Sequence, residues 1–312
     1  MTTQSIRMQT QVPILLMAFI RPDLIQKVMK HLAKFSPPIL YVMGDGPRNA
    51  DEEVLCEKSR EIALNPSWEC EVIPIFNDCN EGIVASFVKG MERMFSEHEF
   101  GIYLEDDVLL SKSFYKFSSD LLMRYRNHSN VGHINATNML PQYKPKHKAS
   151  YIFGNFITEW GFATWSRMWK SYDVNIREWN SINKNALISE ICFNFRSKRN
   201  FKKMLELHCN NPRPLAWGYQ WQFNCLNNKA LAITPSANMS LNIGFERNDS
   251  TNTFGQNPIA SKLQDCDFPL SHPKEIIADL QYDRVVSNTL CPSDWSILRG
   301  KVRNKFSKFI KI

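Results

Sequence analysis

Three consecutive acidic residues, Glu105, Asp106 and Asp107, follow the apolar run that ends at Leu104. Adjacent carboxylates repel one another and favour a cationic partner, and a hard divalent ion with oxygen ligands is the usual one. In an extended segment alternate side chains point to opposite sides, so Glu105 and Asp107 face one way and Asp106 the other. The alternative is a solvated acidic turn that caps the following helix. Because the triplet stands at the end of a strand, the metal is favoured.

Polar side chains also follow the other predicted strands. Arg21 comes after the first strand, where a guanidinium can meet a diphosphate. Asp45 comes after the second, where a carboxylate can accept a hydrogen bond from a base or a sugar. Asn80 and Gly82 stand where a helix begins, and the amides of a helix N-terminus can bind an anion. Taken singly, these residues also fit a surface charge, a turn residue and an ordinary helix cap.

Six of the eight tryptophans are concentrated between Trp160 and Trp221. Aromatic faces stack on the apolar faces of sugars, so this stretch suits sugar binding. Packing in the core is at least as common a role for any single tryptophan. His272 is a candidate late metal ligand, and a hydrogen-bonded structural histidine is the alternative.

The elements that position these residues alternate between strands and helices. Short apolar runs predict the strands, and helical spacing of apolar residues predicts the helices between them. The predicted strands cover 14–19, 39–43, 71–76, 101–104 and 131–136, and the predicted helices cover 23–33, 52–64, 83–95, 113–126 and most of 180–211. This order indicates an α/β fold with a mostly parallel sheet and helices on both faces. Ligands of such sheets bind beyond the carboxyl ends of the strands.

Composition and missing motifs exclude several classes of protein. The 312 residues carry a formal charge of +7 and 43% hydrophobic residues, which is ordinary for a folded chain. Neither a dinucleotide-binding glycine loop nor G-x-x-x-x-G-K-[ST] is present, which argues against NAD enzymes and P-loop NTPases. The eight cysteines form no C-x-x-C pair, so neither a zinc knuckle nor a redox dithiol is indicated. No apolar run is long enough to span a bilayer, and no secretory signal is evident, which indicates a cytoplasmic protein.

The positive charge is concentrated in residues 296–312, which carry six Lys and Arg and no acid. Apolar residues recur in this segment at helical spacing, and a basic amphipathic helix binds anionic membrane surfaces. The segment therefore predicts a protein that is peripheral on the inner membrane, with a solvated helix docked on its own domain as the alternative. The rest of the chain has no basic patch in its sequence, so nucleic acid is not an expected partner.

An ordered set of segments over about residues 12–285 carries a resemblance to a known family. The set comprises Phe19-Ile20-Arg21-Pro22, Gly44-Asp45-Gly46-Pro47-Arg48, Asn80-Glu81-Gly82, Glu105-Asp106-Asp107, Trp160-Gly161-Phe162-Ala163-Thr164-Trp165, Trp217-Gly218-Tyr219-Gln220-Trp221 and Asn242-Ile243-Gly244-Phe245. It resembles the GT-A-fold glycosyltransferases, and in pattern most of all the bacterial relatives of N-acetylglucosaminyltransferase I.

The resemblance implies a Rossmann-like GT-A domain over residues 1–285, followed by the basic tail at 286–312. Residues 12–140 would bind the nucleotide sugar, and residues 141–285 would form a Trp-rich acceptor half. The implied activity is metal-dependent transfer of a hexosyl or N-acetylhexosaminyl group. The sugar would pass from a nucleoside-diphosphate sugar, with UDP favoured, to a hydroxyl of a bacterial surface glycan or lipid-linked acceptor. Inversion is favoured over retention.

The resemblance also implies roles for individual residues. Asp107 would be the direct ligand of Mn²⁺ or Mg²⁺. The donor would be held by Arg21, Asp45, Arg48, Asn80, Gly82, Glu105 and Asp106, and the catalytic Asp106 would face the sugar or ribose. The acceptor would be bound by Trp160, Gly161, Trp217, Tyr219 and Gln220. The ion would neutralise charge on the leaving diphosphate.

Two departures from the family pattern concern the general base. The relatives commonly carry an aspartate base at the position of Gly218, and often a histidine at the position of Asn252. A positioned carboxylate typically supplies about 10²–10⁴ in rate. Glu159 is the predicted catalytic substitute, and Glu246 and Asp249 are weaker candidates. The alternative hypothesis is a catalytically degenerate protein of the same fold that binds nucleotide sugar. A sugar-nucleotide pyrophosphorylase fits less well, because residues 13–23 lack a glycine-rich basic loop.

Overall fold

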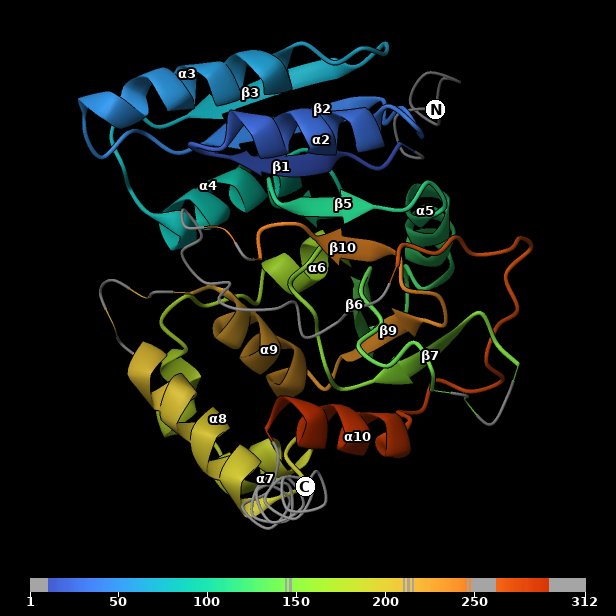
Figure 1. Cartoon of the computed structure of the whole chain (residues 1–312). Coiled ribbons are helices and arrows are strands. Elements are labelled where there is room, and N and C mark those ends of the chain that lie inside the picture. The colour runs from blue at the N-terminus through green and yellow to red at the C-terminus, as the bar shows by residue number, and fades with distance from the viewer. Residues whose placement is uncertain are drawn as a thin grey trace, which may run out of the picture.

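The computed structural model describes residues 11–143, 145, 148–209, 211, 214, 216–245, 247 and 262–291. In this part of the chain an eight-stranded sheet runs through the molecule (Figure 1). Its strands, in spatial order, are β3 (Glu71–Phe76), β2 (Ile39–Gly44), β1 (Ile14–Ala18), β4 (Phe100–Leu104), β8 (Phe162–Trp165), β6 (Val131–Asn135), β9 (Leu231–Pro235) and β7 (Tyr151–Gly154).

The first four strands in this order are parallel, and β8 then runs antiparallel between β4 and β6. β9 returns to the parallel direction beside β6, and β7 closes the sheet antiparallel to β9. The predicted α/β class with a mostly parallel sheet is therefore confirmed. Every residue of β1, β2 and β4 is buried, as expected for strands covered on both faces.

Two hydrophobic clusters show which helices cover each face of the sheet. One cluster joins Ile14, Leu16 and Ala18 of β1 to α2 (Pro22–Leu32), α3 (Ala50–Leu64) and α5 (Phe114–Arg124). The other joins Leu15 and Met17 of the same strand to α4 (Ile83–Phe95), α6 (Ser166–Trp169) and α9 (Gly218–Asn227). Because successive residues of a strand point to opposite faces, β1 separates two layers of core, and the expected helices on both faces are confirmed.

The sequence-predicted helices and strands of the first 136 residues agree with the structure to within about two residues. The long helical stretch predicted over residues 180–211 is instead three pieces: the 3₁₀ turn η1 (Arg177–Asn180), α7 (Lys184–Ser189) and α8 (Phe195–His208). Asn183 and Asn194 cause the breaks, because each side chain accepts a hydrogen bond from a backbone amide and starts a new helix.

The C-terminal described element is α10 (Leu280–Leu290), which packs on β7. The expected boundary between residues 285 and 286 falls inside this helix. The basic segment 296–312 and the candidate bases Glu246 and Asp249 lie outside the described residues. Over the residues that are described, no helix combines the length and apolar character needed to cross a membrane.

Two strand pairings bring distant segments to the carboxyl end of β4. β8 pairs with β4 with Phe162 opposite Tyr103, so the residues just before β8 meet those just after β4. A separate two-stranded sheet pairs β5 (Val108–Leu110) with β10 (Ser240–Asn242), with Asn242 opposite Val108. The acidic triplet therefore lies between residues 159–161 on one side and residues 242–245 on the other.

Candidate active site

A cleft of about 430 Å³ opens at the carboxyl ends of β1, β2 and β4. It collects Arg21, Asp45, Arg48, Asn80, Gly82, Glu105, Asp106, Asp107, Glu159, Trp160 and Trp217, together with Phe19, Ser86, Asn242 and Phe245 among others. All residues predicted from the sequence to bind the nucleotide sugar therefore line one cavity. Gly161, Tyr219, Gln220 and His272 do not line it.

Arg21 binds both aspartates of the acidic triplet. Its Nε donates to Asp106 Oδ2 at 3.1 Å, its Nη1 donates to Asp107 Oδ2 at 3.1 Å, and its Nη2 pairs with Asp106 Oδ1. Burial alone lowers the pKa of Arg21, but the charges of Asp106 and Asp107 outweigh it and raise the pKa. The two carboxylates, only 4% and 5% exposed, thus share one guanidinium at the cleft wall, which offsets one of their two negative charges.

The segment after β10 holds Asp107 from the other side. Asn242 Nδ2 donates to Asp107 Oδ1 at 3.3 Å, and the amide of Ile243 donates to the Asp107 carbonyl at 2.7 Å. A Cβ added at Gly244 would overlap with Asp107 Oδ2, so only glycine permits this close approach. Sequence reasoning quoted this segment for its resemblance alone, and its function as a support for Asp107 follows from the strand pairing.

Glu105 is held by a residue of its own strand. The hydroxyl of the fully buried Tyr103 donates to Glu105 Oε1 at 2.9 Å. Burial raises the pKa of Glu105, and the negative charges of Asp107 and Glu159 raise it further. Glu105 therefore holds a proton more readily than an ordinary glutamate.

Asp45 has a different role from the one expected. Its two carboxylate oxygens accept five hydrogen bonds of 2.9–3.0 Å, from Gly46 N, Asn77 Nδ2, Asn80 Nδ2, Glu81 N and Gly82 N. A carboxylate offers about four lone-pair positions, so these donors saturate it. The prediction that Asp45 offers a free acceptor to a base or sugar does not fit this structure. Asp45 instead joins the loops after β2 and β3 and fixes the cleft wall.

Arg48 and Asn80 lie on the same wall. Arg48 pairs with Glu52 through Nε at 2.8 Å and lies over the ring of Phe19, with its guanidinium carbon 5.3 Å from the ring centroid. Gly82 has φ = +87° and stands immediately before α4, with the amide of Ser86 bonded to its carbonyl. The side chain of Arg48 is half exposed and lines the cleft.

Glu159 places a further carboxylate in the cleft, next to the start of α9. A Cβ added at Gly218 would overlap with Glu159 Oε1 and Cδ, so the carboxylate fills the space of a side chain at 218. The side chain is open to the cleft, yet protein groups around it desolvate the carboxylate and raise the pKa of Glu159 to about 7. A carboxyl group with this pKa is suited to proton transfer near neutral pH.

The tryptophans divide between the cleft and the core. Trp160 lines the cleft, is partly exposed and lies edge-on to Phe245, with 5.5 Å between ring centroids. Trp217 lines the cleft with only 3% exposure and stacks on Phe87 at 4.4 Å. Trp165, Trp179 and Trp221 are fully buried. The core alternative is therefore correct for these three, and Trp160 is the more exposed of the two tryptophans that line the cleft.

Three predicted acceptor residues lie elsewhere. Gly161 is buried at φ = +77° and forms the turn into β8. Tyr219 packs against α8, 6.1 Å from Phe201 and 5.5 Å from His208 between ring centroids. Gln220 is fully buried inside α9. On a helix only one face can meet a cavity, and Trp217 rather than its neighbours occupies that face.

His272 is not near Asp107, so its prediction as a metal ligand is wrong. Its Nδ1 bonds to the hydroxyl of Tyr151 at 2.9 Å, and that hydroxyl also meets the hydroxyl of Tyr125. Within the described residues, no three His, Cys, Asp or Glu side chains converge as a metal-binding group. The structural alternative, a hydrogen-bonded histidine, is the correct one.

The residues present fit a divalent ion whose remaining ligands are substrate phosphates and waters. Asp106 and Asp107 are hard oxygen donors, and Arg21 already shows that they bind positive charge together. Magnesium sites commonly use one or two carboxylates plus substrate phosphates and waters. Two carboxylates facing a cleft are therefore sufficient on the protein side when a diphosphate supplies further oxygens.

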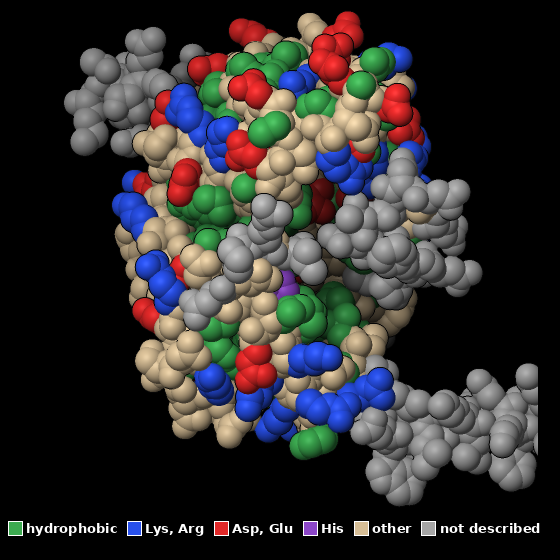
Figure 2. Space-filling view, turned by 90° about the vertical axis from the view of Figure 1, so that its left-hand side faces the viewer, with side chains coloured by type: hydrophobic (Ala, Val, Ile, Leu, Met, Phe, Trp, Pro, Cys, Tyr) green, Lys and Arg blue, Asp and Glu red, His purple; other side chains and the backbone are tan. Residues whose placement is uncertain are grey.

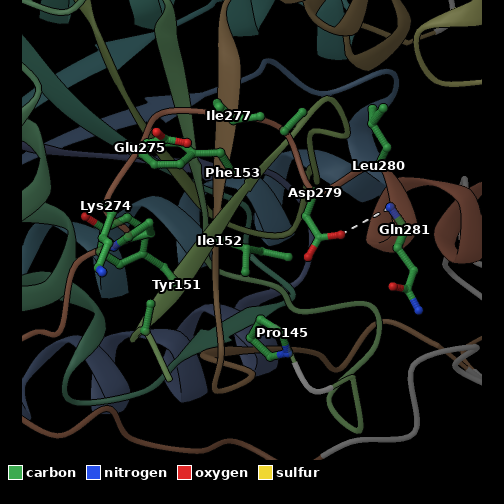
Figure 3. A pocket seen from close by; sticks show the side chains of 13 residues that line it. Pro145, Tyr151, Ile152, Phe153, Lys274, Glu275, Ile277, Asp279, Leu280 and Gln281 are labelled. Atoms are coloured by element: carbon green, nitrogen blue, oxygen red, sulfur yellow. Dashed lines mark hydrogen bonds between the residues drawn. The ribbon is translucent and has the colours of Figure 1, made fainter. Parts of the chain in front are cut away.

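A second cavity of about 580 Å³ lies at the edge of the sheet, beside β7 (Figure 3). Tyr151, Ile152 and Phe153 form one wall, and the segment from Pro273 to Gln281 forms the other. The Asp279 carboxylate is occupied by the amides of Gln281 and Tyr282 at the start of α10 and by the Tyr143 hydroxyl. This cavity contains none of the predicted site residues.

No protein-family model and no curated protein matches the chain. Solved structures with a similar arrangement include S. aureus TarS 1-349, with a TM-score of 0.42 and 11% identity over 72% of this chain and 58% of that one. Another is the mannosyltransferase PcManGT from Pyrobaculum calidifontis in complex with GDP-Man and Mn²⁺. Its TM-score is 0.36, with 10% identity over 69% of each chain. The match spans less than two thirds of TarS 1-349, and likeness of this degree assigns no function by itself.

Proposed function

We propose that the chain is a GT-A-type glycosyltransferase that transfers a sugar from a nucleoside-diphosphate donor to an acceptor hydroxyl. The observation that carries the proposal is the cleft itself. One cavity at the carboxyl ends of parallel strands joins a guanidinium, two buried aspartates and a separate carboxylate of raised pKa. Phosphate recognition, cation binding and proton transfer are the functions that these groups supply together.

On the donor side, Asp107 is the proposed direct ligand of Mn²⁺ or Mg²⁺, and Asp106 faces the sugar or ribose. A divalent ion, when bound, neutralises charge that develops on the leaving diphosphate. Arg21 pairs with both aspartates in the free protein. A diphosphate offers the guanidinium an alternative partner of higher charge, so Arg21 can exchange the aspartates for the donor. Arg48 lies on the same wall and supplies a further positive charge.

On the acceptor side, Glu159 is the proposed general base. Its carboxylate takes the proton of the acceptor hydroxyl while that oxygen forms a bond to the sugar C1 and the bond from C1 to the diphosphate breaks. The family to which the sequence is similar commonly has an aspartate at position 218. The overlap between Glu159 and a side chain at 218 supports the substitution, because both positions deliver a carboxylate to one place. Trp160 offers a face on which the acceptor sugar can stack.

The finer assignment rests on the sequence resemblance. It favours a UDP-hexose or UDP-N-acetylhexosamine as donor, an inverting outcome, and a bacterial surface glycan or lipid-linked glycan as acceptor. The predicted membrane contact of residues 296–312, and the placement on the inner membrane, belong to the same proposal. None of these assignments changes which residues of the cleft act.

The test begins with thermal unfolding in the presence of UDP-, GDP-, dTDP- and CMP-sugars, each with Mn²⁺ and with EDTA. A ligand that binds only the folded state raises the unfolding temperature by mass action. We expect one nucleotide to give a shift that EDTA removes, and transfer to be detected when that donor is offered with a panel of glycan acceptors. Donor binding without transfer or hydrolysis would favour the degenerate nucleotide-sugar-binding protein. The absence of any shift would contradict both.

A further inference from the structure

The outer side of α8 concentrates positive charge. An α-helix turns by about 100° per residue, which places Lys198, Arg199, Lys202 and Lys203 on one side, with Arg196 at its margin. The opposite side carries the buried Ser197, Leu205 and His208. Glu206 is the one acid of the helix, and it pairs with Lys202 at 3.8 Å. Figure 2 shows Lys and Arg side chains gathered over this part of the surface.

Two large apolar side chains of α8 are exposed, and Phe195 lies on the basic side. Phe195, in the first turn, is 75% exposed, more than any other large hydrophobic residue among those described. Leu207, in the last turn, is 50% exposed. An exposed phenylalanine among lysines and arginines gains nothing from water, whereas a lipid interface accepts both the ring and the charges. The combination fits a bilayer surface better than a nucleic acid or a solvated face.

The helix is fixed to the body from behind. Phe201 and His208 of α8 pack against Tyr219 of α9, and Asn194 closes a capping box with Ser197. On the outer side of the helix, Lys198, Arg199 and Lys203 are exposed. α9 begins at Gly218, beside the cleft, so the same helix contacts α8 with one face and the candidate active site with its first turn.

A groove leads from the cleft toward the end of α8. It has a volume of about 1020 Å³, shares Asn80, Gly82 and Ile83 with the cleft, and reaches Asn211 just beyond the last turn of α8. Figure 1 shows α8 at the lower left, on the outer side of α9.

We propose that the outer side of α8 is a docking surface for an anionic phospholipid bilayer, with Phe195 as the inserted residue. The basic residues are attracted to the negative surface potential, and each is worth roughly 1 kcal/mol near such a surface. The proposal stands on the charge and exposure of α8 and does not depend on the proposed chemistry of the cleft. It also differs from membrane contact through residues 296–312, because the surface belongs to the described body of the protein.

The experiment measures sedimentation of the full chain with phosphatidylcholine vesicles, with and without phosphatidylglycerol. The test variant is Lys198→Gln/Arg199→Gln/Lys203→Gln. The matched control is Lys27→Gln/Lys30→Gln/Lys58→Gln, which removes the same charge from exposed positions of α2 and α3. We expect the test variant to lose at least about tenfold in partitioning to anionic vesicles, and the control less than about twofold. Phe195→Ser should also weaken binding, and more visibly at high salt, where charge attraction is screened.

The unfolding temperature is measured on the same samples, to show that each variant is folded. Equal partitioning of the test and control variants would overturn the proposal. So would loss of binding only when the basic residues of 296–312 are replaced, because the contact would then belong to that segment. Binding of an RNA oligonucleotide that needs α8, without binding of anionic vesicles, would assign the surface to nucleic acid instead. A failure of the proposed transferase activity leaves all of these readings unaffected.

Discussion

The carboxylate of Glu159 occupies the space that a side chain at position 218 would need, and Gly218 has no side chain that would compete for it. The two residues come from different elements, since Glu159 precedes β8 and Gly218 begins α9. A carboxylate at either position would therefore reach the same part of the cleft. This relationship converts the missing aspartate from an argument against catalysis into a specific prediction about where the base is.

The exchange of these two positions can be tested directly. Gly218→Ala should displace the Glu159 carboxylate and lower turnover to near the level of Glu159→Ala. The double variant Glu159→Ala/Gly218→Asp should recover at least about tenfold over Glu159→Ala, because it returns a carboxylate to the cleft. The measurement is the steady-state transfer rate of the parent protein, the two single variants and the double variant. A double variant no better than Glu159→Ala would mean that the carboxylate at 159 has another function.

Glu159→Gln keeps the size of the side chain and removes its ability to take a proton. We expect turnover to fall by about 10²–10⁴, with little change in the donor-dependent rise of the unfolding temperature. Glu61→Gln, on the exposed side of α3, is the control and should behave as the parent protein. A change in donor affinity as large as the change in turnover would argue that Glu159 binds rather than deprotonates.

The pH dependence of transfer follows from the pKa of Glu159, which desolvation by the surrounding protein groups raises to about 7. A general base acts in its deprotonated form, so the rate should rise as the pH increases through 7 and level off above about 8. A glutamate of ordinary pKa would already be deprotonated at pH 6 and would give a flat profile there. The rate of Glu159→Gln, measured over the same range, should lack the rise. A parent profile that is flat from pH 6 to 8 would contradict the assignment.

Substitutions at Asp107 and at His272 should have opposite effects on the Mn²⁺ dependence of nucleotide binding. Asp107→Asn should abolish the Mn²⁺-dependent part of the nucleotide-induced stabilisation, because it removes a charged ligand at the cleft. His272→Phe should preserve the metal dependence and lower the unfolding free energy by about 1 kcal/mol, through loss of its bond to Tyr151. Titration of each variant with Mn²⁺ in the presence of the nucleotide distinguishes a metal ligand from a structural residue. Loss of metal dependence in His272→Phe would restore the histidine as a ligand.

Asp283 predicts a pH dependence of stability outside the cleft. This fully buried residue of α10 accepts bonds from the amide and side chain of Asn155, and burial raises its pKa to about 7. Between about pH 4 and 7 the folded state holds a proton that the unfolded state releases, so this group contributes stability at low pH that is lost as the pH rises.

Asp283→Asn removes that titration. The unfolding free energy of the parent minus that of the variant should fall between pH 5 and pH 7, by at most about 1.4 kcal/mol per pH unit. Urea unfolding of both proteins at pH 5 and at pH 7 measures this difference in unfolding free energy. A difference that stays constant with pH would mean that Asp283 remains ionised in the folded protein.

The alternation of strands and helices, and the polar residues at the strand ends, were predictable from the sequence. The runs before Arg21, Asp45 and Glu105 are apolar and short, so each marks a buried strand whose end must face the same edge. A short apolar run predicts a buried strand and its end without knowledge of distant contacts. All the residues predicted in this way to bind the donor line one cleft.

The remainder depends on contacts between distant segments. Nothing near Asp45 in the sequence indicates that the loop after β3 saturates its carboxylate, and nothing near Gly218 indicates that Glu159 fills its space. The position of His272 also depends on tertiary packing against Tyr151. The breaks at Asn183 and Asn194 could have been found, since an asparagine before a helical run is a capping signal.

The antiparallel pairing of β4 with β8 has a consequence for the rate as well as the fold. Tyr103 pairs with Phe162, and this register sets how far the residues after β4 stand from those before β8. A slip of two residues would keep every side chain on its proper face, yet it would shift Glu159 relative to Asp107 by about 7 Å. Backbone hydrogen bonds between these two strands, none of which touches a substrate, therefore hold the proposed base and the proposed leaving-group site in alignment.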